Sequence, residues 1–158
     1  MIVTGKAKEK AFAECLMKQY GGYIDTATKY EDIYEHVDLK WMFNGQWWGI
    51  DVKGLKRNKR QEPIDENIHW VEIKNVHGYP GWLHGKAHMF AFETEDYWLI
   101  IGKKALQELV YQKVDWSKEI CNDNQSLYVL YQREFRLDVI VKVKTLDLMK
   151  IAHTIITK

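Results

Sequence analysis

The first hydrophobic positions of the chain recur with a helical period. Phe12 and Leu16 lie four positions apart, so both side chains fall on one face of a helix. Thr4 is a suitable N-cap, and Gly21 ends the run because glycine readily adopts the left-handed conformation that follows many helices. The pattern therefore predicts a helix over residues 5–20.

Residues 35–55 carry the pattern of a β-hairpin. Asn44 and Gly45 lie between two alternating segments, and this pair favours a two-residue turn because both turn positions need a positive φ. Such a turn fixes the register of the two strands. Trp41 is then expected to face Trp48 across the hairpin.

The same register divides the hairpin into two faces, since side chains alternate along a strand. The predicted core face carries Val37, Leu39, Trp41, Phe43, Trp48, Ile50 and Val52. The opposite face carries Asp38, Lys40, Met42, Trp47, Gly49, Asp51 and Lys53. Asp38 and Asp51 are expected to be directly opposite each other, with Lys53 on the same side.

The rest of the chain is predicted as short strands and helices joined by polar loops. Strands are expected at 23–28, 68–76, 89–93, 97–101, 127–135 and 137–144, and helical segments at 82–87, 103–113 and 145–152. Residues 29–34 and 56–67 are expected as connections, and residues 116–126 as irregular. This order predicts a mixed α/β (α+β) fold with a central mixed sheet and flanking helices. No repeat or linker divides the chain, so residues 1–158 are expected to form a single domain.

Composition and charge narrow the function only slightly. The chain has 158 residues, a net charge of +1, seven Trp and nine Tyr. A nucleic-acid partner would therefore have to be met by a local basic patch, with the aromatic residues as stacking platforms. Because no signal peptide or long apolar run is visible, we expect a cytoplasmic protein without a membrane partner. Cys15 and Cys121 are too far apart for a zinc ribbon or a disulfide framework.

The acids of the hairpin are the strongest candidates for chemistry. In the predicted register, Asp38 and Asp51 form a non-hydrogen-bonded pair with Cα atoms about 4.5 Å apart, where like charges repel. A bound Mg²⁺ or Mn²⁺ explains the pair, because hard cations are held by one or two carboxylates with water and phosphate oxygens. Lys53 could orient the attacking water or balance negative charge. The competing interpretation is a solvated strand face with scattered charges.

Asp38 on one strand and Asp51-Val52-Lys53 on the next, after an N-terminal helix, resemble the motif of the PD-(D/E)XK nuclease superfamily. The resemblance implies a restriction-endonuclease-like core of helix, three-stranded meander, helix and strand within the first hundred residues. It also implies a metal-dependent endonuclease that hydrolyses DNA, with catalytic residues Asp38, Asp51 and Lys53. Val37 stands where many members of the superfamily have proline.

The resemblance adds two further metal ligands. The backbone carbonyl of Val52 is expected to help hold the cation, and many members supply a glutamate from the first helix. Glu9 shares a face with Phe12 and is our choice, whereas Glu14 lies between lysines, as is typical of a solvated ion-pair position.

Glu72-Ile73-Lys74 is a second acid-x-lysine segment on a predicted strand. It could be the primary motif, with Asp51 as its first acid. Glu72 and Lys74 could alternatively be secondary contributors if their strand pairs beside Asp51. The alternative without a catalytic role is that this segment is an exposed strand edge.

A basic run begins at the proposed site and is expected to contact DNA phosphates. It consists of Lys53, Lys56, Arg57, Lys59 and Arg60.

His84 and His88 are spaced for zinc on a helix, with His77 nearby. Gly85 weakens that helix, so we expect these histidines to be surface or packing residues.

The sequence thus predicts a small Mg²⁺- or Mn²⁺-dependent deoxyribonuclease. By analogy it would be a phage-type or resolvase-like enzyme, structure-specific and active as a homodimer. One alternative is a non-catalytic nucleic-acid-binding or protein-interaction module on a nuclease-like fold. Another is a different hydrolase that uses the histidines and a transition metal.

Overall fold

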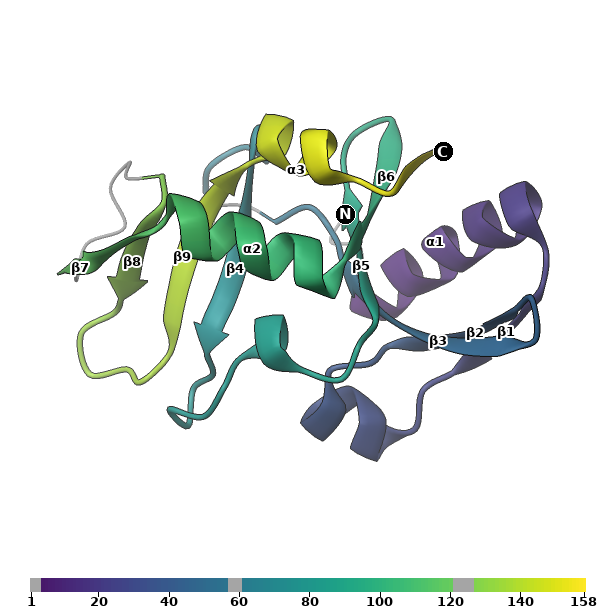
Figure 1. Cartoon of the computed structure of the whole chain (residues 1–158), viewed down its shortest axis with the longest axis horizontal. Coiled ribbons are helices and arrows are strands. Elements are labelled where there is room, and N and C mark those ends of the chain that lie inside the picture. The colour runs from purple at the N-terminus through teal and green to yellow at the C-terminus, as the bar shows by residue number, and fades with distance from the viewer. Residues whose placement is uncertain (1–3, 57–60, 121–126) are drawn as a thin grey trace.

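The computed structural model describes residues 4–56, 61–120 and 127–158. Within these ranges the chain forms two mixed β-sheets flanked by helices (Figure 1), which confirms the mixed α/β class. The helical elements are α1 (Gly5–Tyr20), the π-helix η1 (Glu31–Glu35), the 3₁₀-helix η2 (Trp82–His84), α2 (Lys103–Lys113) and α3 (Thr145–Ile151). None of them is both long enough and apolar enough to cross a membrane.

The larger sheet has the strand order β1-β2-β3-β5-β6-β10. Its strands are β1 (Tyr23–Thr26), β2 (Leu39–Phe43), β3 (Gln46–Lys53), β5 (Met89–Glu93), β6 (Tyr97–Gly102) and β10 (Thr154–Thr157). The first three form an antiparallel meander, and β3 then pairs in parallel with β5. The strand β3 is therefore held on both edges.

The smaller sheet has the order β4-β9-β8-β7. Its strands are β4 (Ile68–Lys74), β7 (Asp115–Ile120), β8 (Val129–Gln132) and β9 (Val139–Lys144). Figure 1 shows α2 lying across this sheet. Val71, Val141 and Val143 are fully buried and belong to the cluster that contains the buried side chains of α2. The alternate side chains of β4 and β9 lie on the other face.

The helix α1 begins and ends where the sequence predicts. The Thr4 hydroxyl accepts a hydrogen bond from the Ala7 N–H at 3.3 Å, and Gly21 takes a φ of 72° at the C-terminal end. Phe12 and Leu16 are buried in a cluster with Trp41, Ile50 and other residues of the larger sheet. This packing fixes α1, and with it Glu9, against one face of the sheet.

The predicted hairpin register is confirmed from the turn as far as Leu39. Asn44 and Gly45 have φ values of 52° and 74°, and Trp41 pairs with Trp48. The ladder then ends at the pair Leu39 and Ile50. Asp38 donates its N–H to the Ile50 carbonyl at 2.9 Å, so two successive residues share one partner, as in a β-bulge.

Two details of the hairpin prediction are therefore wrong. Asp38 lies outside β2 and does not form a ladder pair with Asp51. Val37 is also not on the face of Leu39. Its methyl groups would lie 3.4 Å from a Cβ built on Gly49, and Gly49 belongs to the opposite face of the hairpin. The bulge shifts the alternation by one residue, and Val37 packs into the cluster between the sheets.

Other differences concern elements with weak patterns. Residues 29–34, predicted as a connection, contain most of η1, and residues 116–126, predicted as irregular, contain most of β7. The strand β10 was not predicted. The helix expected at 82–87 is only the three-residue η2, so the helix that the superfamily core places after the meander is missing from the described residues there. After β3 the chain crosses instead to β4 in the smaller sheet.

Phe12 tests the attachment of α1. Its side chain is fully buried and packs edge-on against Trp98, with ring centres 5.2 Å apart. We expect Phe12→Ala to lower the free energy of unfolding by about 3–5 kcal/mol in urea titrations, because truncation leaves a cavity. Exposed Lys10→Ala, on the same helix, should change it by less than about 0.5 kcal/mol. Equal effects would show that α1 is not anchored through Phe12.

Candidate functional site

A cavity of about 290 Å³ lies at the end of β3 and is bordered by α1, η1 and the segment that follows β3. We call it the acidic cavity, because four of its lining residues carry carboxylates. Its lining residues are Gly5, Lys8, Glu9, Asp32, His36, Asp38, Asp51, Val52, Lys53, Gly54, Leu55 and Lys56. The structure thus brings together the acids, the lysine and Val52 that the sequence singled out.

Asp51 is the most buried acid of this cavity, with 2% of its surface exposed. Its Oδ1 atom lies 2.7 Å from the Lys53 Nζ, as expected for residues two positions apart on one strand. Its Oδ2 atom is buried and has no hydrogen-bond partner among the described residues. The pKa of Asp51 is raised to about 7. Burial is the largest cause and the charge of Asp38 adds to it, while Lys53 acts in the opposite direction.

Asp38 reaches the cavity because of the bulge. Its Oδ2 atom accepts a hydrogen bond from the Val52 N–H at 2.7 Å. In an unbroken ladder that N–H would bond to the carbonyl of Val37, the residue opposite Val52 in the hairpin register. The carboxylate replaces a backbone acceptor, and this interaction holds Asp38 beside Asp51 although the two residues are not a strand pair.

Glu9 enters the same cavity from α1. Its Oε2 atom lies 3.5 Å from the Lys6 Nζ, and only 14% of its side chain is exposed. Burial raises the pKa of Glu9, and the charge of Asp38 raises it further. Glu9 therefore points inward, as predicted, and is electrostatically coupled to Asp38.

Two further residues of the cavity, Asp32 and His36, were not selected from the sequence. Asp32 lies on η1, and His36 follows η1 in the left-handed conformation with a φ of 56°. Burial lowers the pKa of His36. The acidic run at residues 31–32, shortly before Asp38, is the one sequence signal that could have indicated this wall.

The donor set fits a hard cation with few protein ligands. Within the described ranges, no three Asp, Glu, His or Cys side chains are grouped closely enough to form a metal-binding cluster. Asp38 and Asp51 nevertheless provide two carboxylates, and Mg²⁺ usually needs no more than one or two beside water and substrate phosphate. The unpaired, buried Oδ2 of Asp51 is the atom that most needs a positive partner.

The second acid-x-lysine segment lies elsewhere. Glu72 and Lys74 are on β4 in the smaller sheet, whereas β3 pairs with β2 and β5. Glu72 accepts a hydrogen bond from the Trp82 N–H at 3.2 Å and lines a different cavity. The condition for a secondary role, that this strand pairs beside Asp51, is therefore not met.

The basic run is described only in part. Lys53 and Lys56 line the acidic cavity, and burial lowers the pKa of Lys56, with a further lowering from Lys53. Arg57, Lys59 and Arg60, expected to contact DNA, lie outside the described residues.

The histidines considered for zinc have separate partners. His88 accepts a hydrogen bond from the Gly49 N–H at 2.8 Å, and His84 stacks on Tyr111 with ring centres 6.0 Å apart. His77 is exposed. These contacts confirm the expected packing and surface positions of the three histidines.

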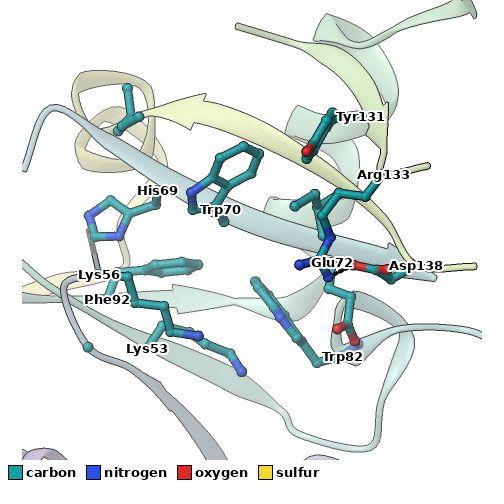
Figure 2. Close-up of a pocket in the computed structure, with 13 residues that line it drawn as sticks. Lys53, Lys56, His69, Trp70, Glu72, Trp82, Phe92, Tyr131, Arg133 and Asp138 are labelled. Atoms are coloured by element: carbon teal, nitrogen blue, oxygen red, sulfur yellow. Dashed lines mark hydrogen bonds and ion pairs between the residues drawn. The ribbon is translucent and has the colours of Figure 1, made fainter. Parts of the chain in front are cut away.

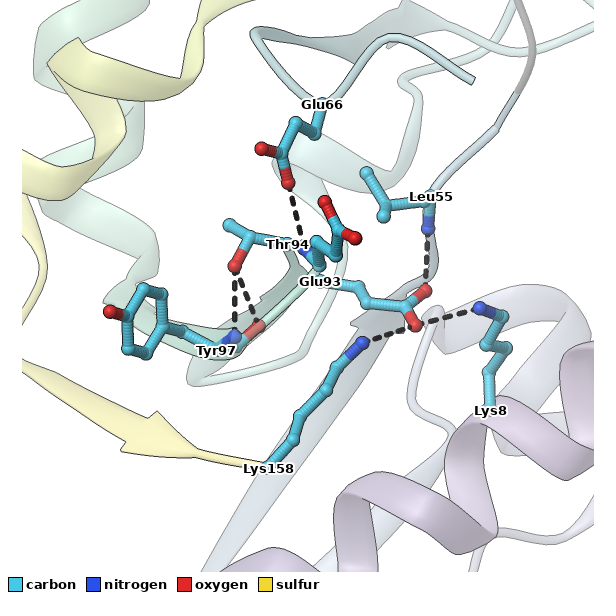
Figure 3. Close-up of polar contacts among 8 residues, drawn as sticks. Lys8, Leu55, Glu66, Glu93, Thr94, Tyr97 and Lys158 are labelled. Atoms are coloured by element: carbon cyan, nitrogen blue, oxygen red, sulfur yellow. Dashed lines mark hydrogen bonds and ion pairs between the residues drawn. The ribbon is translucent and has the colours of Figure 1, made fainter. Parts of the chain in front are cut away.

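Glu93 is the centre of a network of polar contacts (Figure 3), and two of its partners, Lys8 and Leu55, line the acidic cavity. The Glu93 carboxylate lies 2.7 Å from the Lys8 Nζ and 2.8 Å from the Lys158 Nζ, and it accepts the Leu55 N–H at 2.8 Å. Burial would raise the pKa of Glu93, but these hydrogen bonds lower it overall. The network ties α1, the chain end and the segment after Lys53 to β5.

Comparison of the chain with protein-family models, with curated proteins and with solved structures gave no match in any of the three. The function must therefore be inferred from the residues of the acidic cavity.

The raised pKa of Asp51 predicts a distinctive pH dependence of stability in metal-free buffer. The unfolded carboxyl titrates near 3.8, the ordinary pKa of an aspartate, and the folded one near 7, so its ionisation costs stability progressively between these values. We therefore expect the free energy of unfolding of Asp51→Asn to increase by about 2–4 kcal/mol relative to that of the wild type as the pH rises from 4 to 8. The pKa of about 7 already includes the attraction of Lys53, so loss of this ion pair adds no further pH-dependent contribution.

Urea titrations across this pH range measure the effect, and exposed Asp25→Asn serves as the control for removing an acid. A stability difference that stays constant with pH for Asp51→Asn would contradict a raised pKa.

Proposed function

We propose that the chain is a metal-dependent endonuclease that hydrolyses DNA phosphodiester bonds at the acidic cavity. The observation that carries the proposal is the buried Asp51 carboxylate, with one oxygen on Lys53, the other without a partner among the described residues, and Asp38 beside it. A folded protein leaves a buried charged group incompletely paired only at a cost, and such groups concentrate at functional sites. The resemblance to the PD-(D/E)XK motif supports the same assignment.

The residues of the cavity would divide the work as follows. Asp38 and Asp51 would hold Mg²⁺ or Mn²⁺ with the Val52 carbonyl, and Glu9, which is not grouped closely enough with both acids to be a third direct carboxylate ligand, would contribute through a bound water. The bound ion would activate water and neutralise charge on the phosphodiester. The Lys53 ammonium, already 2.7 Å from Asp51, would orient the attacking water and offset the negative charge that develops on the phosphate.

DNA would approach along the segment that follows β3. Lys56 lines the cavity, and the basic run continues through Arg57, Lys59 and Arg60 in the sequence. Phosphate contacts of this kind make binding weaker at high salt. By analogy with small nucleases of the superfamily, we infer a structure-specific substrate and a homodimer.

A non-catalytic nucleic-acid-binding or protein-interaction module is the second candidate. It is favoured by the structural partners that both acids already have. Lys53 neutralises Asp51, and Asp38 accepts the Val52 N–H, so each acid has a role without any cation.

A cleavage assay separates the two candidates. Linear, circular and branched DNA are incubated with Mg²⁺, Mn²⁺ or EDTA, and we expect cleavage only with metal. Asp38→Asn, Asp51→Asn and Lys53→Met should each lower the rate about 100-fold or more, because each removes a group that acts in the reaction. Exposed Asp25→Asn should cleave at the wild-type rate.

Intact DNA in every condition, with binding retained, would favour the second candidate. Cleavage that survives Asp38→Asn but is lost with Glu72→Gln would move the site to β4.

Metal binding can be measured without DNA. A cation that binds only the folded state at 100 times its Kd adds about 2.7 kcal/mol of stability. We therefore expect Mn²⁺ to raise the Tm of the wild type by about 5–10 °C. The shift should vanish in the Asp38→Asn, Asp51→Asn double variant and persist in Asp25→Asn. An equal shift in the double variant would place the cation elsewhere.

A further inference from the structure

A second cavity, of about 320 Å³, is lined by the residues drawn in Figure 2. Lys53, Gly54 and Lys56 line both cavities, so the two are separated only by the end of β3 and the segment after it. The volume lies at the lower end of the range of about 300–1,000 Å³ that is usual for small-molecule sites. We call it the aromatic cavity, for the side chains described next.

One wall of the aromatic cavity is the outer face of the smaller sheet. Trp70 on β4 and Tyr131 on β8 are half-buried, and their ring centres lie 6.0 Å apart. Lys142, opposite Trp70 in the ladder, is buried and is not among the residues that line the cavity; its Nζ lies 5.0 Å from the centre of the Trp70 ring. A sheet face that presents aromatic side chains is a common platform for unpaired bases.

The facing wall is also aromatic. Trp82 and Phe92 have ring centres 6.1 Å apart, and Figure 2 shows them across the cavity from Trp70 and Tyr131. The Lys53 Nζ lies 4.3 Å from the centre of the Trp82 ring. Phe92 is fully buried and Trp82 is 9% exposed, so a flat, aromatic ligand would stack chiefly against the half-buried Trp70 and Tyr131, with its phosphate near Lys53.

The polar groups of the cavity suit the edge of a base. Asp138 is 4% exposed and bonds Arg133 through Oδ2 at 2.6 Å, whereas its buried Oδ1 has no partner among the described residues. His69 is 6% exposed, and its Nε2 is also without a partner there; burial lowers its pKa to about 4, so the ring is neutral at pH 7. Three of the four unpartnered buried side-chain atoms in the described part of the chain thus belong to residues that line the two adjoining cavities.

We propose that the aromatic cavity binds one unpaired nucleobase of the DNA strand whose phosphate lies at the acidic cavity. This inference rests on the proposed nuclease function and specifies its substrate. A base inside a duplex is stacked on both sides and must leave the helix to enter such a pocket. The preferred substrate therefore carries an unpaired nucleotide beside the scissile bond, as at branches, flaps or frayed ends.

The first test measures binding in EDTA, where no cleavage occurs. A fluorescein-labelled single-stranded oligonucleotide and a blunt duplex of the same sequence are titrated with protein and followed by anisotropy. Trp70→Ala and Tyr131→Ala should each weaken binding of the single strand about fivefold or more, while the duplex is affected less than about twofold. Trp70→Phe should restore most of the affinity. Trp47→Ala, an exposed tryptophan outside both cavities, is the matched control.

The second test uses the wild-type protein, so it does not depend on the folding of a variant. The single strand is compared with an oligonucleotide of the same length made of abasic sugar phosphates. Because the phosphates are the same, a loss of about fivefold or more reports stacking of the bases. Equal affinity for both, or equal losses for single strand and duplex in the aromatic variants, would overturn the proposal.

The outcomes separate this inference from the proposed function. Asp25→Asn, which changes an exposed acid outside both cavities, should leave binding of the single strand in EDTA within about twofold of the wild type. If the wild type cleaves no DNA with any metal but still binds the single strand through its bases, the nuclease function is refuted and the base pocket is kept. Metal-dependent cleavage that is no faster on branched or single-stranded DNA than on duplex would refute the base pocket and keep the nuclease.

Discussion

The burial of the Asp51 carboxylate is the constraint on which the site depends. Asp51 lies on β3, which is hydrogen-bonded to β2 on one edge and to β5 on the other, so its backbone cannot move to relieve the charge. Lys53 neutralises one oxygen at 2.7 Å, and the other oxygen has no partner among the described residues. A buried ion pair gains little net stability because desolvation offsets the attraction. The burial of this carboxylate is therefore the observation on which the proposed cation site rests.

The bulge at Asp38 converts an ordinary hairpin into the wall of a cavity. It turns the Asp38 carboxylate toward β3, where it takes over a backbone hydrogen bond of Val52 and raises the pKa of Asp51. It also sends Val37 into the core between the sheets. Lys53 then stands between two cavities, with its ammonium on Asp51 and over the Trp82 ring. In the proposed function, this single side chain would connect phosphate chemistry to base recognition.

Much of this architecture could be predicted from local patterns, and the failures have physical causes. Asn44-Gly45 determined the register, because a two-residue turn with positive φ at both positions allows only one alignment of the two strands. The bulge could not be predicted, since no residue type near Val37 or Asp38 requires it.

Elements that depend on distant partners were also missed. The strand β7 is polar and pairs with β8 through an irregular register, and β10 is a short strand at the edge of the larger sheet. The sequence likewise could not tell that β4 joins the smaller sheet, which separates Glu72 from Asp51. Asp32 and His36 come from a π-helix and its C-terminal end, where five residues carry no clear periodicity.

A crystal structure of the protein grown with Mn²⁺, with anomalous diffraction data to locate the ion, would show directly whether the acidic cavity binds a cation. We predict one anomalous peak within coordination distance of the Asp38 and Asp51 carboxylates, with the Lys53 ammonium beside it. A structure in which Asp51 remains paired with Lys53 alone, while manganese binds elsewhere or not at all, would contradict the assignment.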